Sequence, residues 1–320
     1  MNKRVFILIG LLSLCHNAMA VDVLPLDDAL RATYTACVGI DEELSDLKKM
    51  AGINTAITAV GTGLGIGAVA TGLSKAKTDE LLAQKYQEMT DLSYAAPVWG
   101  DLADEEEMEK QLDKSFDETK STDNNLNAAQ QNERQAEIDR LESKSKKLGN
   151  WRTGLLAGNT ATNVAGAIIA GTNKVDKSLQ EQIDDCRLAV KNLQDSIIVA
   201  KMDGQDVTEA KQIQSICSGF NYVDISKINK RATGAMVSSS VGAGTGLAGT
   251  ITSALANSNK VRRDNTDHGQ HKEKNLNTAS NVLAVGSTAA SATATVFNAT
   301  QIKAIKDVAT VAEQCSEVLK

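Results

Sequence analysis

The chain has 320 residues, a formal net charge of -6 and only 3% aromatic residues. The acidic balance excludes a generally basic surface of the kind that binds nucleic acid. With only two prolines, long stretches have no helix breaker, and the shortage of aromatic and turn residues favours an elongated helical protein over a catalytic domain.

Residues 1–20 have the three-part pattern of a secretory signal peptide. A positive start at residues 3–4, an apolar stretch at residues 5–14 and a small-x-small cleavage site ending at Ala20 follow one another. The apolar stretch is shorter than a membrane span requires. Cys15 lacks the small preceding residue expected for a lipid anchor. We therefore expect cleavage after Ala20 and export to the periplasm, the surface or the outside of a bacterial cell.

Four cysteines follow the signal peptide, and an even number in an exported chain predicts two disulfides. They are Cys37, Cys186, Cys217 and Cys315. No two of them form the close C-x-x-C pair of a zinc site, and no His lies near any of them. The cysteines therefore predict no metal site.

The mature chain contains two copies of one unit. Residues 50–72 resemble residues 231–253, and residues 161–186 align without a gap with residues 290–315. The first pairing places Gly61, Gly63 and Gly65 on Gly242, Gly244 and Gly246. Each unit consists of a Cys, an outgoing arm, a connector, a returning arm and a second Cys.

The repeat predicts an all-α fold of two tandem long helical hairpins whose tightly packed antiparallel arms form an elongated four-helix rod. An arm of about 40 residues would be about 60 Å long as a helix. Because each hairpin must close its own ends, we expect the pairs Cys37–Cys186 and Cys217–Cys315. The expected parts are a first repeat at 21–186, a helical linker at 187–216 with a turn at Asp203-Gly204, and a second repeat at 217–320.

The first connector, at about residues 77–145, is long and acidic, whereas the second, at 257–274, is short and polar. Residues 115–133 are nearly free of apolar side chains and are expected to be poorly ordered. The acid cluster at 104–107 is expected to keep this segment soluble, because paired carboxylates act on sugars only within a cleft.

The glycine-rich stretches allow three interpretations, of which the first is a phosphate-binding loop. Residues 244–249 fit GxGxxG, and residues 63–68 fit its GxGxxA variant. That chemistry needs a strand before the turn and a helix after it. No alternation of strands and helices surrounds either stretch, so we expect no cofactor.

The second interpretation is a membrane span. Four windows without a charged residue, 50–74, 153–173, 232–259 and 275–302, have 25, 21, 28 and 28 residues and are long enough to cross a bilayer. Their many Asn, Ser and Thr residues lower the hydrophobicity below that of a typical span. A membrane-inserting protein with glycine-zipper-like stripes stays open as the alternative.

The third interpretation, tight helix packing, is the preferred one. Small residues four positions apart share a helix face and let two helices approach closely. A glycine costs a helix about 1 kcal/mol relative to Ala, so these glycines need a compensating neighbour. The Thr, Ser and Asn side chains are expected on the faces turned away from that seam. The predicted packing residues are Gly61, Gly63, Gly65, Gly154, Gly158, Gly166, Gly242, Gly246, Ala284 and Ala292.

Few other side chains suggest chemistry. Asp267, His268 and His271 could bind a metal, but in a polar connector we expect them to be solvated, and no catalytic triad is expected elsewhere. Trp99 and Trp151 flank the tip of the first hairpin, where packing together and contact with a partner both stay open.

The sequence thus predicts an exported, non-enzymatic structural or interaction protein of the cell envelope. We expect it to bind copies of itself or another envelope protein, to be soluble without detergent, and to need no cofactor or metal. The membrane-inserting alternative would instead require detergent or release dye from vesicles.

Overall fold

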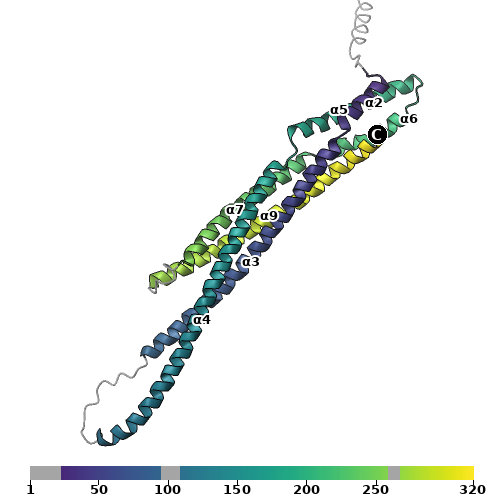
Figure 1. Cartoon of the computed structure of the whole chain (residues 1–320). Coiled ribbons are helices and arrows are strands. Elements are labelled where there is room, and N and C mark those ends of the chain that lie inside the picture. The colour runs from purple at the N-terminus through teal and green to yellow at the C-terminus, as the bar shows by residue number, and fades with distance from the viewer. Residues whose placement is uncertain (1–22, 95–108, 259–266) are drawn as a thin grey trace, which may run out of the picture. The chain divides into compact units, whose positions relative to one another are not determined.

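The computed structural model describes residues 23–94, 109–258 and 267–320, with side chains left out at 90–94, 109–128 and 267–270. Every regular element in these ranges is a helix, and none of the described residues forms a strand (Figure 1). The all-α prediction is confirmed. The elements are α2 (Leu26–Cys37), α3 (Ile40–Tyr94), α4 (Glu109–Thr172), α5 (Lys177–Met202), α6 (Thr208–Cys217), the 3-10 helix η1 (Ser218–Tyr222), α7 (Ser226–Ala256) and α9 (Asp267–Leu319).

Four of these helices are long, with 55 residues in α3, 64 in α4, 31 in α7 and 53 in α9. None of them contains a proline, so no backbone donor is missing from their ladders. Two of the breaks between the described helices occur where the backbone needs glycine. Gly39, between α2 and α3, has φ 96°, and Gly204, after α5, has φ 75°.

The first connector contains the start of a long helix. Helix α4 begins at Glu109 and runs through residues 115–133, the segment for which the sequence predicted poor order. Polarity alone does not oppose a helix. Residues 109–148 contain no Gly or Pro, and Glu, Lys, Gln and Ala are good helix formers. The acid cluster at 104–107 and Trp99 lie outside the described residues.

The returning arm of the first repeat is two helices rather than one. Helix α4 ends at Thr172, and α5 begins at Lys177 after the N-cap residue Asp176. The Asp176 carboxylate accepts a hydrogen bond of 2.8 Å from the Leu179 backbone N–H, which satisfies a free donor of the first turn. The returning arm of the second repeat is continuous, since α9 extends to Leu319.

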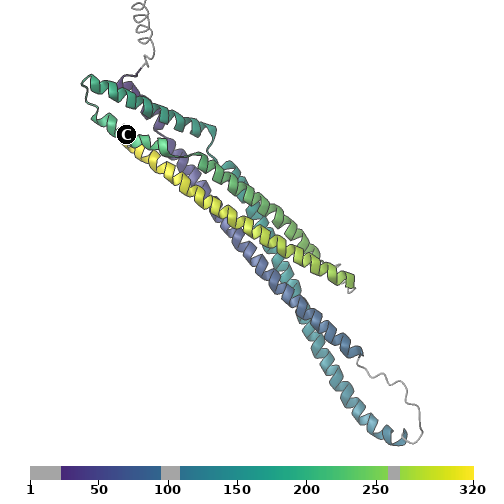
Figure 2. The same ribbon diagram turned by 180° about the vertical axis from the view of Figure 1, so that it is seen from behind.

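The chain divides into two compact units. We call residues 23–56, 166–237 and 293–320 the cysteine unit, and the remaining described residues, within 57–165 and 238–292, the glycine unit. Helices α3, α4, α7 and α9 each contribute residues to both units. Helices α7 and α9 run side by side in two opposite views (Figures 1 and 2).

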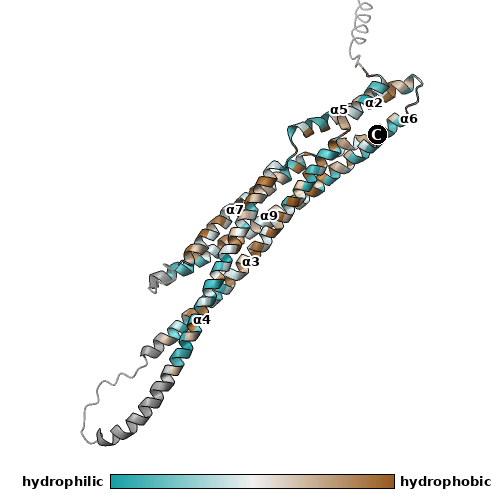
Figure 3. Cartoon of the chain, viewed as in Figure 1, coloured by the Kyte–Doolittle hydropathy of each residue, from teal (hydrophilic) through white to brown (hydrophobic). Residues whose placement is uncertain are grey.

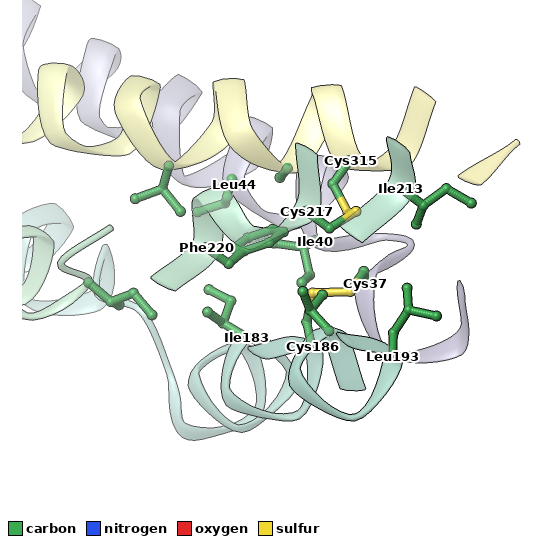
Figure 4. Packing of buried hydrophobic residues seen from close by; sticks show 14 of the residues in the cluster. Cys37, Ile40, Leu44, Ile183, Cys186, Leu193, Ile213, Cys217, Phe220 and Cys315 are labelled. Atoms are coloured by element: carbon green, nitrogen blue, oxygen red, sulfur yellow. A yellow bond between two sulfur atoms is a disulfide. The ribbon is translucent and has the colours of Figure 1, made fainter. Parts of the chain in front are cut away.

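The cysteine unit has a conventional apolar core, formed around its two disulfides. Cys37 is bonded to Cys186 and Cys217 to Cys315, with Cα–Cα distances of 4.8 Å in both pairs. These are the two pairs that the internal repeat predicts. All four cysteines are fully buried, and Figure 4 shows them among Ile40, Leu44, Ile183, Leu193, Ile213 and Phe220. The core thus joins α2, α3, α5, α6, η1 and α9.

The glycine unit has a very different interior. Its apolar cluster contains only Ala68, Leu156 and Ala284 as buried members, with Val69 and Leu155 packed against them. The other buried positions are occupied mainly by glycine and by short polar side chains. This unit therefore depends on close backbone approach and hydrogen bonds more than on apolar burial.

Candidate functional site

Two glycines of α3 lie where a neighbouring helix leaves no room for a side chain. A Cβ atom added to Gly61 would lie 2.5 Å from Thr162 Oγ1 of α4. At Gly65 an added Cβ would overlap Thr288 Oγ1 of α9. Both glycines are buried. At these two positions any larger residue forces the helices apart.

Two glycines of α7 occupy the equivalent positions in the second repeat. An added Cβ at Gly242 would lie 2.8 Å from Asn163 Cγ, and one at Gly246 would lie 2.6 Å from Thr160 Oγ1 and 2.9 Å from Ser287 Oγ. Helix α7 thus packs closely against α4 and α9 within the glycine unit.

The other predicted packing residues range from buried to exposed. Gly158 faces Leu64, whose Cδ1 would lie 3.1 Å from an added Cβ, and Ala284 belongs to the small apolar cluster. Gly166 is buried and Ala292 half-buried. The structure differs from the prediction at Gly63 and Gly154. Both are exposed, and an added Cβ at either would meet nothing within 4 Å. Gly63 lies two positions from Gly61 and Gly65 and therefore off their face, whereas Gly154 continues the four-residue spacing of Gly158 and Gly166 without a close neighbour.

A polar network joins α4, α7 and α9 at the centre of the glycine unit. Asn159 Nδ2 donates to Ser287 Oγ (2.9 Å), and Asn163 Nδ2 donates to Asn159 Oδ1 (2.9 Å). Ser291 Oγ lies 3.0 Å from the Oδ1 atoms of both asparagines, and Ser287 Oγ donates to the Gly242 carbonyl oxygen (2.8 Å). All four polar residues are fully buried.

The cysteine unit contains similar bonds between its long helices. Asn54 Nδ2 of α3 donates to Asn298 Oδ1 of α9 (2.9 Å), and Gln301 Nε2 donates to the Asn173 carbonyl oxygen (2.8 Å). Asn54, Asn298 and Gln301 are fully buried. Amide side chains therefore face inward along the charge-free windows of both repeats.

Most of the large apolar residues of the same windows face outward, although Leu156 is fully buried. The exposed fraction of the outward side chains runs from 46% at Val164 to 67% at Val282. The outward set is Ile53, Val60, Ile66 and Leu73 on α3, Val164 and Ile168 on α4, Val237, Val241, Leu247, Ile251 and Leu255 on α7, and Val282, Val285 and Val296 on α9. Figure 3 shows apolar residues along these helices and a hydrophilic stretch of α4 before its window. We call this outward set the apolar band.

The apolar band overturns the expectation that Ser, Thr and Asn would face away from the seam. Close helix approach brings short polar side chains of neighbouring helices within hydrogen-bonding distance of one another, so they satisfy each other inside. Most of the branched Val, Ile and Leu side chains are too large for that seam and lie on the outside.

Threonines at half-buried positions bond to their own helix. Each hydroxyl donates to the carbonyl oxygen four residues earlier, at 2.7 to 2.9 Å, in Thr62, Thr71, Thr160, Thr250 and Thr288. This back-bonding satisfies the hydroxyl without water or a second helix. These five hydroxyls therefore have a partner within their own window.

A charged cluster lies in the glycine unit, just after the α3 window ends and just before the α9 window begins. The Lys75 side chain is only 1% exposed, and its Nζ donates to Asp79 Oδ2 (2.5 Å) and to Glu273 Oε1 (3.2 Å). Asp79 also accepts from Ser145 Oγ (2.5 Å) and from Asn277 Nδ2 (3.5 Å). The Asp79 carboxylate thus connects α3, α4 and α9.

Arg152, fully buried at the start of the α4 window, lies in the same unit. Its burial lowers its pKa to about 10, against the raising effect of the Asp79 charge. Its Nη2 donates to the Asn277 carbonyl oxygen (3.3 Å). Gly72 makes room here, because an added Cβ would overlap Asn281 Oδ1 and lie 3.0 Å from Arg152 Nε.

Of the three candidate metal ligands in the second connector, only His271 has a described side chain, and it is exposed; the side chains of Asp267 and His268 lie outside the described ones. Cys37, Cys186 and Cys315 have their sulfur atoms within 4.8 Å of one another, but each is held in a disulfide. A disulfide sulfur is not a thiolate ligand.

Two helical segments, Leu26–Met89 and His271–Leu319, are long and apolar enough to cross a membrane by length and composition. A core helix of a soluble protein passes the same test, but such a helix is mostly buried. Only 28% of the apolar window is buried in each of these segments.

We expect the replacement of Gly246 by Leu to lower the free energy of unfolding by about 1 to 3 kcal/mol, because the new side chain collides with Thr160 and Ser287. The matched control is Gly244→Leu, two residues away on α7, where nothing lies within 4 Å of an added Cβ. Thermal unfolding followed by circular dichroism measures both. Equal losses in the two variants would mean that Gly246 is not a packing position.

Protein-family models, characterised proteins and solved structures were compared with the chain, and none of the three comparisons gives a match. The geometry described above therefore carries the functional argument alone.

Proposed function

We propose that the chain is an exported, non-enzymatic protein of the bacterial cell envelope whose four charge-free windows lie in a lipid bilayer. In this proposal the windows are the arms of two tandem helical hairpins, packed as a four-helix rod and closed at the base by the disulfides. The single observation that carries the proposal is the inverted polarity of the windows, with amides inside and the apolar band outside.

The energetics of that polarity differ between water and lipid. In water each half-exposed Val, Ile or Leu leaves on the order of 1 kcal/mol of transfer free energy unrealised. In a bilayer the same side chains contact acyl chains, while buried amides and hydroxyls must find partners within the protein. The network of Asn159, Asn163, Ser287 and Ser291 meets that second requirement for these four side chains. Ser239 Oγ, Asn281 Oδ1 and Gln301 Oε1 are buried without a hydrogen-bond partner.

The window lengths agree with a bilayer. The shortest window, 153–173 on α4, has 21 residues and is about 32 Å long as a helix. The hydrocarbon core of a bilayer is about 30 Å thick. The windows of α3, α7 and α9 are longer and would span the same thickness when tilted.

A second candidate is a water-soluble scaffold in which further copies of the chain cover the apolar band. Gly63, Gly154 and Gly244 favour it, since these exposed glycines leave flat places between the larger side chains where another helix fits. Self-association through these places is also compatible with insertion, so the need for detergent separates the two candidates.

The test is the extraction of the full mature chain from membranes with alkaline carbonate, together with two lysine variants. Leu247→Lys places a charge near the middle of the α7 window, and we expect it to reduce the carbonate-resistant fraction strongly, because a lysine at a span centre costs about 2.5 to 3.5 kcal/mol. The control is Leu188→Lys, which changes a similarly exposed leucine of α5 outside the windows.

Wild type and Leu188→Lys are expected to stay with the membrane. A wild-type chain that carbonate releases, and that stays in detergent-free solution as a discrete oligomer, would contradict insertion. Dissociation of that oligomer by Leu247→Lys would favour the scaffold.

A further inference from the structure

A basic groove lies on α4 just before its charge-free window. Its lining residues are Arg140, Ser143, Lys144, Lys147, Leu148 and Trp151, and its volume is about 480 Å³. The spacing of three and four residues places them on one face of the helix. The groove therefore combines three cations with an apolar floor and an aromatic ring.

Among the described side chains, the charges of the groove have no carboxylate partner at ion-pair distance. No ion pair of the described side chains includes Arg140, Lys144 or Lys147. The nearby Glu142 accepts a hydrogen bond of 2.5 Å at its Oε1 atom from the Tyr86 hydroxyl of α3. Like charges three and four residues apart repel one another. A bound anion would remove that repulsion.

Trp151 marks the end of the groove that lies nearest the α4 window. Its side chain is 70% exposed, which is unusual for so large an apolar ring, and it lies two residues before the α4 window begins at residue 153. Tryptophan prefers the level of the headgroups, where its ring is half in hydrocarbon and its N–H meets polar groups. Basic residues immediately outside a span attract anionic lipids.

We propose that this groove binds the phosphate of an anionic phospholipid headgroup, with Lys144 and Lys147 at the phosphate and Trp151 against the start of the acyl chains. This inference rests on the proposed insertion of the windows, because insertion brings headgroups to the level of Trp151. A lipid fits better than a free anion, since Leu148 and Trp151 supply an apolar surface beside the cations.

The test compares vesicles of phosphatidylcholine alone with vesicles that also contain phosphatidylglycerol, using the full mature chain with Trp99→Phe so that Trp151 is the only fluorophore of its kind. We expect phosphatidylglycerol to strengthen binding and to shift the Trp151 emission to the blue. The double variant Lys144→Glu/Lys147→Glu should weaken binding to phosphatidylglycerol vesicles roughly thirtyfold or more.

The control double variant is Lys146→Glu/Lys272→Glu, which makes the same change in net charge at exposed lysines outside the groove. It should keep most of the preference for phosphatidylglycerol. Equal losses in the two double variants would overturn the groove as a site and leave only general electrostatic attraction. Inorganic phosphate that shifts the Trp151 emission without vesicles would overturn the lipid as its occupant.

Failure of the groove and failure of insertion give different results. A chain that inserts equally into both vesicle types, with carbonate-resistant binding, overturns the groove and leaves the proposed function intact. A chain that floats with neither vesicle type overturns both.

Discussion

Replacement of Cys217 and Cys315 together by alanine is expected to lower the free energy of unfolding by up to about 4.7 kcal/mol, because the bond closes a separation of 98 residues. The pair Cys37 and Cys186, with a separation of 149, is expected to contribute about 5 kcal/mol in the same chain-entropy account. Both bonds lie in the apolar core of the cysteine unit, so the loss also includes the packing of the buried sulfur atoms.

Denaturant unfolding followed by circular dichroism measures these losses in each double variant. The quadruple variant is the useful comparison, since the two bonds share one core and their effects are not expected to add. A loss below about 1 kcal/mol in either double variant would mean that the unfolded chain is already restricted near its cysteines.

The second large effect is expected at Asp79. We expect Asp79→Ala to cost about 3 kcal/mol, because it removes the closest partner of the buried Lys75 and an acceptor of Ser145. Glu273 remains beside Lys75, which keeps the loss at the low end for a broken buried pair.

Asp139→Ala is the matched control for Asp79→Ala. Asp139 is an exposed aspartate of α4 whose carboxylate accepts from Gln135 on the same helix, and its replacement is expected to change stability by less than about 0.5 kcal/mol. Thermal unfolding of the two variants in the same buffer measures the loss of stability in each. If both lose the same amount, Lys75 does not depend on Asp79.

The sequence was sufficient for the all-α class and for the cysteine pairs because both follow from local or repeated signals. Small residues with a four-residue spacing marked the inner faces of α3 and α7, as at Gly61 and Gly246. The repeat placed Cys186 on Cys315, and this equivalence chose one pairing of three.

The same signals could not predict whether the polar residues would lie inside or outside. Helical periodicity shows that Asn159 and Asn163 share one face and that Val164 and Ile168 share another. It does not show which face is inside, because that depends on how closely the neighbouring helices approach. The basic groove was missed for a related reason, since lysines at 144 and 147 also fit an ordinary solvated face.

The placement of the two disulfides in one core has a consequence for the order of oxidation. The sulfur atoms of Cys37, Cys186 and Cys315 lie within 4.8 Å of one another, so proximity in the folded unit does not by itself distinguish right from wrong partners. A chain that is exported from its N-terminus delivers Cys37 and Cys186 before Cys217 and Cys315. If the chain is exported as proposed above, threading through a translocation channel would supply the correct partners in sequence, so that each pair could close before a competing thiol arrives.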